Sequence, residues 1–340
     1  MSKNTAILVT GAAGFIGWKV CEFLLTHPEL IPENIDRDAT VVGIDNINDY
    51  YDIQLKEWRL EQLQKTKLSG RQFVFYREDI ENLAALKELF MRHQFVAVVN
   101  LAARAGVRYS LENPFVYYTT NVIGNLNLLE LCRECGVRKF ILASSSSLYA
   151  GQEMPFQEDL PVNEPISPYA ASKKSGEVTC YAYHHLYNID VTVLRYFTVY
   201  GPASRPDMAP LRFISWIFQE RPVTIYGDGS QSRDFTYIDD IARGTLLALK
   251  PLGFEIINLG GDRPYALLDF LRVVEEKIGR KAKLEYKSFH PADMKATWAD
   301  IKKARRLLDW QPSIYLEQGV EHAIQWFREN HAIAAKIRLV

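Results

Sequence analysis

A strand, a glycine-spaced turn and a helix follow one another near the start of the chain, and this order restricts the fold more than any other feature. In the segment Ile7–Gly17, an apolar β-branched stretch runs into a helical pattern, with glycines at positions 11, 14 and 17. One glycine permits the tight turn, one lets the backbone approach a pyrophosphate, and one lets the helix pack closely on the strand. The phosphate then rests at the amino terminus of the helix, where unpaired N–H groups favour an anion. The segment predicts a dinucleotide-binding turn formed by Gly11, Gly14, Phe15, Ile16 and Gly17.

A carboxylate at the end of the second apolar run is the second marker of such a site. Asp45 directly follows Val41–Ile44. An acid at this position accepts hydrogen bonds from the ribose 2′-OH of NAD and repels the 2′-phosphate of NADP. The alternative is a solvated loop acid with no ligand. Because the glycine turn and the acid agree, we expect NAD as the cofactor.

Short apolar runs alternate with longer helical stretches through the first half of the chain, a pattern typical of a parallel sheet covered by helices on both faces. We expect strands at about 5–10, 40–45, 73–76, 95–100, 138–143 and 190–195. We expect helices at about 15–27, 51–66, 81–92, 113–135 and 168–188. The helix that carries Leu55, Trp58 and Leu63 is interpreted as packing alone. The predicted fold class is therefore α/β, a Rossmann-like doubly wound parallel sheet.

The pattern changes at about residue 197, where proline and glycine begin to separate shorter elements. We expect a NAD-binding Rossmann domain over residues 1–196, with about 235–262 returning to it. Residues 197–234 and 263–340 then form a smaller C-terminal substrate-binding lobe.

Charge and composition exclude several classes of function. Lys plus Arg total 40 and Asp plus Glu total 41, so no overall basic field exists to hold a nucleic acid or an anionic membrane. The pattern of the first residues predicts no signal peptide, and no run approaches the roughly 20 apolar residues that span a bilayer. We therefore expect a small-molecule substrate, no nucleic-acid partner, no membrane and a cytoplasmic location.

Cysteine and histidine give no sign of a metal or of a disulfide framework. Four cysteines in 340 residues suit a reducing compartment. Cys132 and Cys135 form a Cys-x-x-Cys inside a helical pattern, for which a redox or metal role is the minor alternative to packing. The seven histidines include no ligand spacing such as His-Glu-x-x-His, and we expect no metal.

Three groups in order behind the glycine turn predict proton-transfer chemistry. Tyr169 and Lys173 are four residues apart in a predicted helix and share one face, although this spacing alone would occur by chance. Ser145 follows the fifth predicted strand at the sheet edge where ligands of doubly wound folds bind. A phenol with a pKa near ~10 becomes a base when an ammonium and the nicotinamide charge favour the phenolate. We predict Tyr169 as the base, Lys173 as its activator and cofactor contact, and Ser145 as the hydrogen-bonding partner of the substrate oxygen.

The motifs resemble those of extended short-chain dehydrogenases/reductases that act on nucleotide sugars, over nearly the whole chain. The marks are Thr10–Gly17, Ser144–Tyr149, Ser167–Lys173, Leu194–Pro202 and Arg233–Asp240. The resemblance implies further cofactor contacts at Asp79, Ile80, Ala102 and Asn121. It also assigns Arg233 to the nucleotide diphosphate, for which a fork-shaped guanidinium is suited.

Residues after the catalytic hydroxyl separate the reactions of this superfamily. At these positions the 4,6-dehydratases have a sequence that resembles Ser-Thr-Asp-Glu-Val-Tyr-Gly, in which the acid pair drives elimination. The UDP-glucuronate decarboxylases also carry a glutamate at these positions. This chain has Ser146 and Ser147 at the acid positions. Without the acids, oxidation at C4, rotation of the keto intermediate and reduction from the other face remain, which is epimerisation.

Other residues resemble the UDP-glucuronate 4-epimerase family. UDP-galactose 4-epimerases resemble Arg-Tyr-Phe-Asn at positions 195–198, and this chain has Thr198 in place of the asparagine. The segment Arg205-Pro206-Asp207-Met208-Ala209 follows. Further marks are Asn48–Asp52, Ala105–Arg108 and Thr297–Asp300. The resemblance implies that Arg205 binds the sugar carboxylate with Thr198, Ser146 and Ser147, with Arg108 as a second candidate. The alternatives are that Arg205 simply terminates a loop and that Arg108 pairs with the diphosphate.

Three other functions stay open at this point. They are a UDP-glucose or UDP-N-acetylhexosamine 4-epimerase, a UDP-glucuronate decarboxylase, and a non-catalytic protein that senses dinucleotide. The family resemblance and two long apolar helices, at about 113–135 and 168–188, imply a homodimer joined by a four-helix interface.

Overall fold

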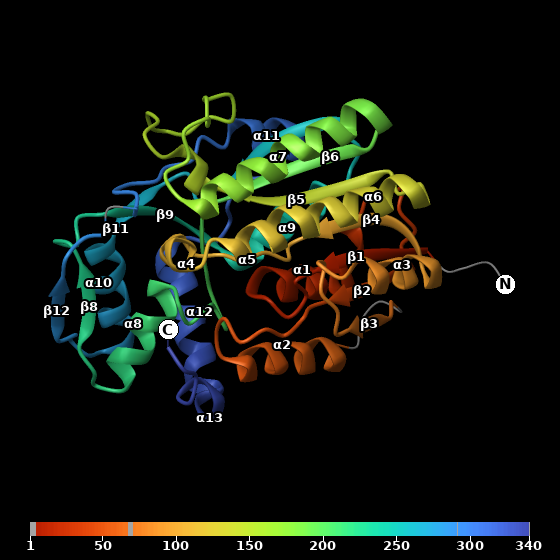
Figure 1. The fold of residues 1–340 in the computed structure, drawn as a ribbon. Coiled ribbons are helices and arrows are strands. Elements are labelled where there is room, and N and C mark those ends of the chain that lie inside the picture. Colours follow the sequence, from red (N-terminus) through yellow and green to blue (C-terminus); the bar gives the residue numbers. More distant parts are fainter. Residues whose placement is uncertain (1–4, 67–70, 291, 340) are drawn as a thin grey trace.

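A seven-stranded parallel sheet lies at the centre of the computed structural model, which describes residues 5–66, 71–290 and 292–339. The strands lie in the order β10-β6-β5-β4-β1-β2-β3, with β1 at the point where the order reverses (Figure 1). Their bounds are β1 Thr5–Thr10, β2 Thr40–Ile44, β3 Phe73–Tyr76, β4 Gln94–Asn100, β5 Lys139–Ser145, β6 Asp190–Tyr196 and β10 Phe254–Leu259. This order and the flanking helices confirm the predicted Rossmann-like doubly wound fold.

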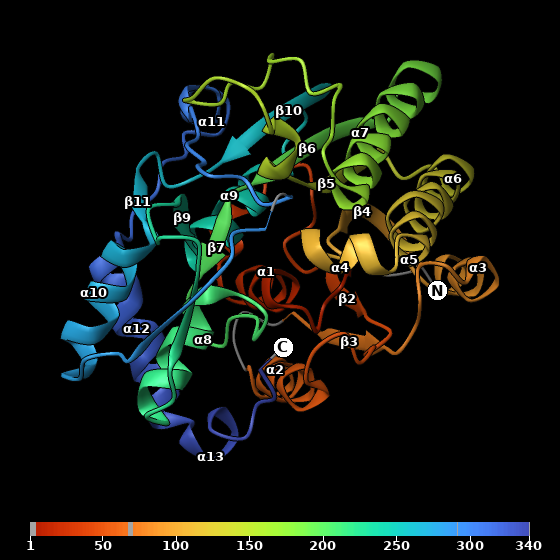
Figure 2. The same cartoon turned by 60° about the vertical axis from the view of Figure 1, so that its left-hand side comes forward.

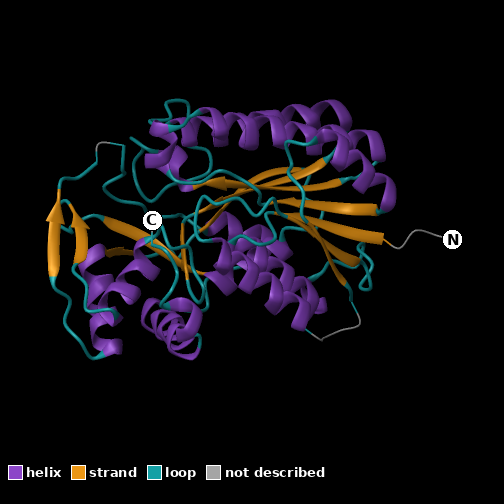
Figure 3. Ribbon diagram, turned by 60° about the horizontal axis from the view of Figure 1, so that its bottom comes forward, coloured by secondary structure: helices purple, strands orange, loops and turns teal. Residues whose placement is uncertain are grey.

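Both faces of the sheet are buried, as the continuous apolar strands require. In β1, Ala6 and Leu8 join one hydrophobic core, and Ile7 and Val9 join the other. Successive side chains of a strand point to opposite faces, so each face needs its own cover of helices. Figure 3 shows the strands as a layer between helices. The core of Ile7 and Val9 is covered by α1 Phe15–Thr26, α2 Ile53–Lys65 and α9 Ile238–Leu247. The core of Ala6 and Leu8 is covered by α3 Leu83–Arg92, α6 Asn125–Cys135 and α7 Pro168–Tyr187.

Two long helices match their predicted positions and have clear local causes. The helix expected at 113–135 runs from Phe115 to Cys135 as α5 Phe115–Tyr118, a wider π-helical segment Thr119–Gly124, and α6. Helix α7 begins where the Ser167 Oγ accepts a hydrogen bond from the Ala170 N–H at 3.2 Å, with proline in the first turn. It ends at Asn188 in the left-handed conformation. This start places Tyr169 in the first turn of α7, at the edge of the sheet.

The later part of the chain adds smaller sheets and helices beside the main sheet. Strand β10 pairs in parallel with β6 and so extends the main sheet at its edge. A three-stranded sheet has the order β11 (Pro264–Ala266), β9 (Ser232–Tyr237), β7 (Thr198–Tyr200), and a parallel pair joins β12 (Leu284–Lys287) to β8 (Val223–Tyr226). Figure 2 shows α8, α10 and α12 gathered next to these strands. The domain boundaries stay a prediction.

The remaining elements have the following bounds. The strands are β7 Thr198–Tyr200, β8 Val223–Tyr226, β9 Ser232–Tyr237, β11 Pro264–Ala266 and β12 Leu284–Lys287. The helices are α4 Val107–Glu112, α8 Ala209–Phe218, α10 Leu267–Ile278, α11 Lys302–Leu308, α12 Leu316–Glu329 and α13 His331–Ala334, with short 3₁₀ turns η1 Pro28–Leu30 and η3 Ser146–Tyr149. In the described ranges, none of these helices combines the length and apolar character that a membrane crossing needs.

Candidate active site

A cleft of about 400 Å³ opens where the parallel strands end at their carboxyl edge. Its walls come from the turn before α1, the ends of β2, β4 and β5, the start of α7, and the loop after β7. Ligands of open α/β sheets bind at this edge, beside the point where the strand order reverses. The predicted site residues that line the cleft are Gly11, Gly14, Phe15, Ile16, Gly17, Asp45, Asp79, Ile80, Ala102, Ser145, Ser146, Ser147, Tyr169, Lys173, Thr198, Arg205 and Arg233. Arg108 and Asn121 are not among its lining residues.

The glycine turn is packed so closely that side chains are excluded from it. Gly11 has a φ of +68°, and a Cβ on it would lie 2.9 Å from the Ala102 nitrogen. A Cβ on Gly14 would lie 2.9 Å from the Gly11 carbonyl oxygen, and one on Gly17 would collide with the same oxygen. Helix α1 begins at this turn with no side-chain cap. Its first N–H groups are therefore open toward the cleft, as an anionic pyrophosphate requires.

The Asp45 carboxylate is held at the end of β2 by two backbone groups. Its Oδ2 accepts the Ala13 N–H at 3.1 Å and its Oδ1 accepts the Ile47 N–H at 2.8 Å. A carboxylate has about four acceptor positions, so two remain for a ribose hydroxyl. Next to it, the Asn46 amide donates to the Asp79 carboxylate at 2.7 Å. The acid is therefore fixed in place and retains acceptor capacity on the cleft side.

A buried polar network joins the ends of β1 and β4. The Thr10 hydroxyl donates to Asn100 Oδ1 at 2.7 Å and accepts the Ala102 N–H at 3.0 Å. Asn121 lies behind this wall, where its side chain accepts the Arg104 N–H at 2.8 Å and donates to the Arg104 carbonyl at 3.0 Å. Its amide also donates to the Ser172 hydroxyl. Asn121 therefore shapes the strand end and the start of α7 rather than the surface of the cleft.

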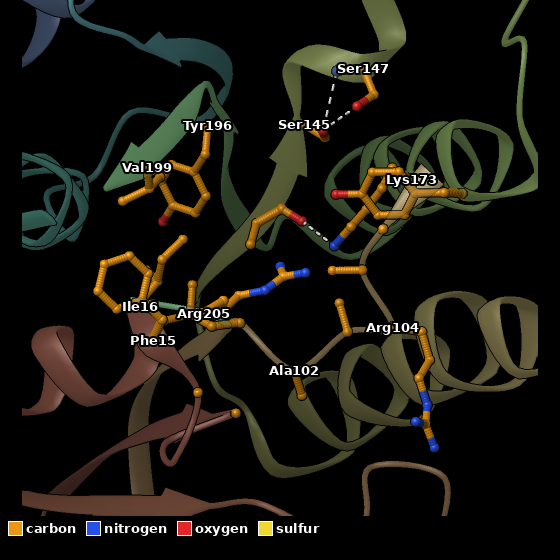
Figure 4. Close-up of a pocket in the computed structure, with 18 of the residues that line it drawn as sticks. Phe15, Ile16, Ala102, Arg104, Ser145, Ser147, Lys173, Tyr196, Val199 and Arg205 are labelled. Atoms are coloured by element: carbon orange, nitrogen blue, oxygen red, sulfur yellow. Dashed lines mark hydrogen bonds between the residues drawn. The ribbon is translucent and has the colours of Figure 1, made fainter. Parts of the chain in front are cut away.

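The three predicted catalytic side chains converge in the cleft. The Lys173 ammonium donates to the Ala143 carbonyl at 2.8 Å, and burial lowers the pKa of Lys173 to about 8 (Figure 4). Burial raises the pKa of Tyr169, while a hydrogen bond with Ser145 and the charge of Arg205 act to lower it. Ser145 Oγ also accepts the Ser147 N–H at 3.1 Å. The phenol, the ammonium and the hydroxyl are thus grouped as proton transfer at one substrate oxygen requires.

A buried ion pair supports this group from behind. Glu177 lies one turn beyond Lys173 on α7 and pairs with Arg195 of β6 at 2.8 Å. Both side chains are almost fully buried. The Ser144 hydroxyl donates to Glu177 Oε1 at 2.6 Å, so the same carboxylate fixes the strand residue before Ser145.

Arg205 reaches the cleft from the loop after β7 and is already paired there. Its Nε donates to Asp207 Oδ1 at 3.0 Å and its Nη2 to Asp207 Oδ2 at 2.5 Å. Figure 4 shows its guanidinium pointing into the cleft toward Lys173. The hydroxyl residues Ser146, Ser147 and Thr198 line the same cleft. Paired donors and hydroxyls of this kind suit a carboxylate.

The two remaining predicted arginines lie near β8 and β9. Arg233 lines the cleft from β9, and its Nη1 donates to the Ser232 carbonyl at 2.8 Å. Arg108 pairs with Asp293 at 2.6 Å and stacks on the Tyr226 ring at 3.9 Å. Arg108 thus lies beside the cleft on α4, with its charge balanced by a residue 185 positions away in sequence.

Helix α2 contributes two buried cations that the sequence interpretation missed. Lys56 lines the cleft and donates to the Asn48 carbonyl at 2.7 Å, and burial lowers the pKa of Lys56 to about 8. Arg59 donates from Nη1 to the Ala13 carbonyl at 3.0 Å and from Nη2 to the Ala203 carbonyl at 2.7 Å. It therefore links the glycine turn to the loop that carries Arg205. The sequence did contain a sign of this role, because Lys56 and Arg59 fall on the apolar face of the predicted helix, where charged residues are not expected.

The Cys-x-x-Cys motif lies away from the cleft on α6. Cys132 is buried and Cys135 exposed, and burial raises the pKa of the Cys132 thiol well above its usual range. Within the described part of the chain, no cluster of three or more histidine, cysteine or acidic side chains is placed to hold a metal.

Comparison with known proteins gives consistent matches along almost the whole chain. Residues 8–323 match the protein family described as GDP-mannose 4,6 dehydratase. A UDP-glucuronate 4-epimerase from Thermodesulfobacterium geofontis is 55% identical over 333 residues, which cover 98% of this chain and 99% of that protein.

Solved structures agree in fold as well as in sequence. The UDP-glucuronic acid 4-epimerase from Bacillus cereus, solved with UDP-glucuronic acid and NAD, is 40% identical with a TM-score of 0.86, covering 95% of this chain and 99% of that one. The UDP-glucose 4-epimerase of Thermotoga maritima, solved with UDP-glucose, is 30% identical with a TM-score of 0.83, covering 96% of this chain and 99% of that one.

Proposed function

The chain belongs to the UDP-glucuronate 4-epimerase family of the extended short-chain dehydrogenases/reductases, and from that membership we propose that it interconverts UDP-glucuronate and UDP-galacturonate with NAD as cofactor. The family predicted from the sequence motifs is thereby confirmed. The observation that carries the choice of sugar is the Arg205 guanidinium, which points into the cleft toward Lys173 and whose charge acts to lower the pKa of Tyr169.

The residues around the glycine turn fit NAD. The space that a Cβ would fill at Gly11, Gly14 and Gly17 is taken by backbone, and the uncapped start of α1 faces the cleft. Asp45 keeps acceptor positions for a ribose hydroxyl and would repel a 2′-phosphate. When bound, NAD⁺ supplies a hydride acceptor for C4 of the sugar and returns the hydride to the same carbon.

The chain's own groups handle the proton of the C4 hydroxyl. Ser145 hydrogen-bonds the substrate oxygen and fixes its direction, and Tyr169 removes the proton from that oxygen. Lys173 stabilises the phenolate that this role requires, because an ammonium close to a phenol lowers the phenol pKa. After the 4-keto sugar has rotated to present its opposite face, the same tyrosine returns the proton to the C4 oxygen.

Epimerisation rather than elimination follows from the hydroxyls at positions 146 and 147. A 4,6-dehydration needs an acid and a base near C5 and C6, and Ser146 and Ser147 supply neither. The broad family description names a dehydratase, but the side chains beside the sugar do not support that reaction in this chain. A carboxylate at C6 is instead matched by Arg205 and the hydroxyls of Ser146, Ser147 and Thr198.

A second copy of the chain is the expected protein partner. Large apolar side chains are exposed along the helical stretch from Phe115 to Cys135 and along α7, the two helices that lie side by side in Figures 1 and 2. They are Phe115, Tyr118, Ile123, Val178, Tyr181, Leu186 and Tyr187, with Phe115 79% exposed. A four-helix interface between two copies would bury this face.

The buried thiols of Cys21, Cys132 and Cys180 suit the reducing cytoplasm, where we place the protein.

Incubation with single substrates tests the proposed activity. The purified protein is given UDP-glucuronate, UDP-glucose or UDP-xylose separately, and the products are followed by NMR. We expect UDP-galacturonate from UDP-glucuronate, with far slower change of the other two sugars. Faster epimerisation of UDP-glucose would make the protein a hexose epimerase, and a demand for NADP would refute the role given to Asp45.

A further inference from the structure

The loop after β7 contains an acid that the proposed reaction has not yet used. Arg205 and Asp207 are separated only by Pro206, and their side chains form a parallel fork of 3.0 and 2.5 Å. The Tyr50 hydroxyl lies 3.5 Å from Asp207 Oδ2, and the Tyr50 ring lies below the guanidinium at 6.0 Å. The side chains of Arg205 and Asp207 are only 23% and 13% exposed. This pair is therefore a partly desolvated, two-bond contact rather than a mobile surface ion pair.

The pairing leaves part of the guanidinium open. Arginine has five N–H donors in one plane. Asp207 takes the donor on Nε and one of the two on Nη2, which are on one edge of the group. The second donor on Nη2 and one donor on Nη1 form a second edge, and the other Nη1 donor lies on the side of Cδ. Since the guanidinium points into the cleft (Figure 4), this second edge is available to a ligand there.

The loop itself is anchored so that the fork cannot drift. Arg59 donates to the Ala203 carbonyl at 2.7 Å, and Arg59 is fully buried. Ala203 has a φ of +52°, a conformation that a non-glycine residue keeps only where its surroundings impose it. Pro206 fixes the backbone between the two paired side chains. The position of Asp207 is thus set by the fold before any ligand binds.

We propose that Asp207 is a positioning residue, which holds Arg205 by its Nε edge so that the outer edge grips the substrate carboxylate in one orientation. This inference rests on the proposed function. The orientation matters because the C4 ketone of glucuronate is a β-keto acid. In decarboxylation the C5–C6 bond breaks, its electron pair passes into the C4 carbonyl to form an enolate, CO₂ leaves, and C5 takes up a proton. A carboxylate held with that bond out of line with the carbonyl π system keeps its carbon.

Asp207→Asn tests the proposal, because asparagine preserves the shape of the side chain but loses the charge and one acceptor. The matched control is Asp269→Asn, which breaks a comparable Arg–Asp pair on the exposed face of α10. Binding of UDP-glucuronate and of UDP-xylose, which lacks the carboxylate, is measured by calorimetry. Decarboxylated 4-keto-pentose is measured as a share of all product.

In metal sites, loss of a residue that orients a ligand costs about 10–100-fold in affinity. By analogy, we expect Asp207→Asn to lose roughly tenfold in affinity for UDP-glucuronate. UDP-xylose affinity should stay within about twofold, and the decarboxylated share should rise. Asp269→Asn should change neither quantity. If the asparagine variant does not fold, Asp207→Glu, which moves the charge outward by one methylene, should shift both quantities in the same direction.

Two results would overturn the role of Asp207. Tighter binding of UDP-glucuronate would mean that Asp207 competes with the substrate for Arg205, and equal losses on both ligands would mean that it only maintains the loop. A wild-type protein that binds UDP-glucuronate better than UDP-xylose yet never converts it would refute the proposed reaction. The ratio of the two affinities would still decide the role of Asp207 in that case.

Discussion

The cofactor side and the sugar side of the cleft are built in different ways. On the side proposed for the cofactor, the groups that face the cleft are backbone groups of the glycine turn and of the open start of α1, together with the Asp45 carboxylate, which the N–H groups of Ala13 and Ile47 hold. The side proposed for the sugar presents long charged side chains, and two of them already form ion pairs within the protein. Arg205 has Asp207 and Arg108 has Asp293.

This difference has a physical cause and a consequence. Backbone groups are fixed by the fold, so they bind a cofactor of constant shape with little rearrangement. Buried or half-buried charges need partners even before a ligand arrives. The sugar side therefore carries its own counter-charges, and those counter-charges decide which donors remain for the substrate.

Tyr169→Phe should produce the largest effect and leave the cofactor side intact. The substitution removes the proton acceptor with little change of volume, and such groups supply about 10²–10⁴-fold in rate. We expect turnover of UDP-glucuronate to fall by that factor while NAD remains bound, measured by product NMR and by cofactor content after purification. A variant with nearly wild-type rate would place the base elsewhere.

Arg205→Ala should have an intermediate effect that is confined to the sugar side. Hydrogen bonds to charged groups contribute about 1.5–3 kcal/mol each, so loss of the carboxylate grip should reduce UDP-glucuronate turnover by roughly 10–100-fold. Any residual turnover of UDP-glucose should fall much less, and decarboxylated 4-keto-pentose should form a larger share of product. Equal losses on both sugars would assign Arg205 to general structure or to the diphosphate.

Arg59→Lys should have the smallest effect on rate, but it couples the two sides. A lysine is a point donor and cannot reach both the Ala13 and Ala203 carbonyls, so one buried carbonyl loses its partner. We expect the free energy of unfolding to fall by about 1–3 kcal/mol in denaturant titrations. The KM for UDP-glucuronate should rise several-fold, since the loop of Arg205 loosens. The exposed control Arg272→Lys should change neither, and an unchanged KM in Arg59→Lys would show that the two sides are independent.

The contrast between backbone groups and charged side chains also explains which parts of the fold and of the site could be predicted from the sequence. The sheet, the helices and the glycine turn depend on local patterns, and the predicted strand at 40–45 and helix at 168–188 agree with β2 and α7 within a residue. The interpretation of α2 as packing alone was incomplete, because it counted the apolar face of the helix and overlooked the charges of Lys56 and Arg59 on that face.

Partners of charged side chains were not predictable, because they are set by tertiary contacts. Asp293 lines the cleft and pairs with Arg108 beside it, although the two residues lie far apart in sequence. Asn121 was assigned to the cofactor on resemblance, and in the structure its amide is used on the backbone of Arg104. A motif identifies a residue type at a place along the chain, whereas the hydrogen-bond geometry depends on what packs against it.

UDP-glucuronate labelled with deuterium at C4 separates a redox-neutral epimerase from every alternative. The purified protein is incubated with this substrate without added cofactor, and the position of the label is read by NMR. We expect UDP-galacturonate that retains the deuterium at C4, with no build-up of reduced nicotinamide. Loss of the label to water, or reduced nicotinamide that grows in proportion to product, would contradict the proposed inversion at C4.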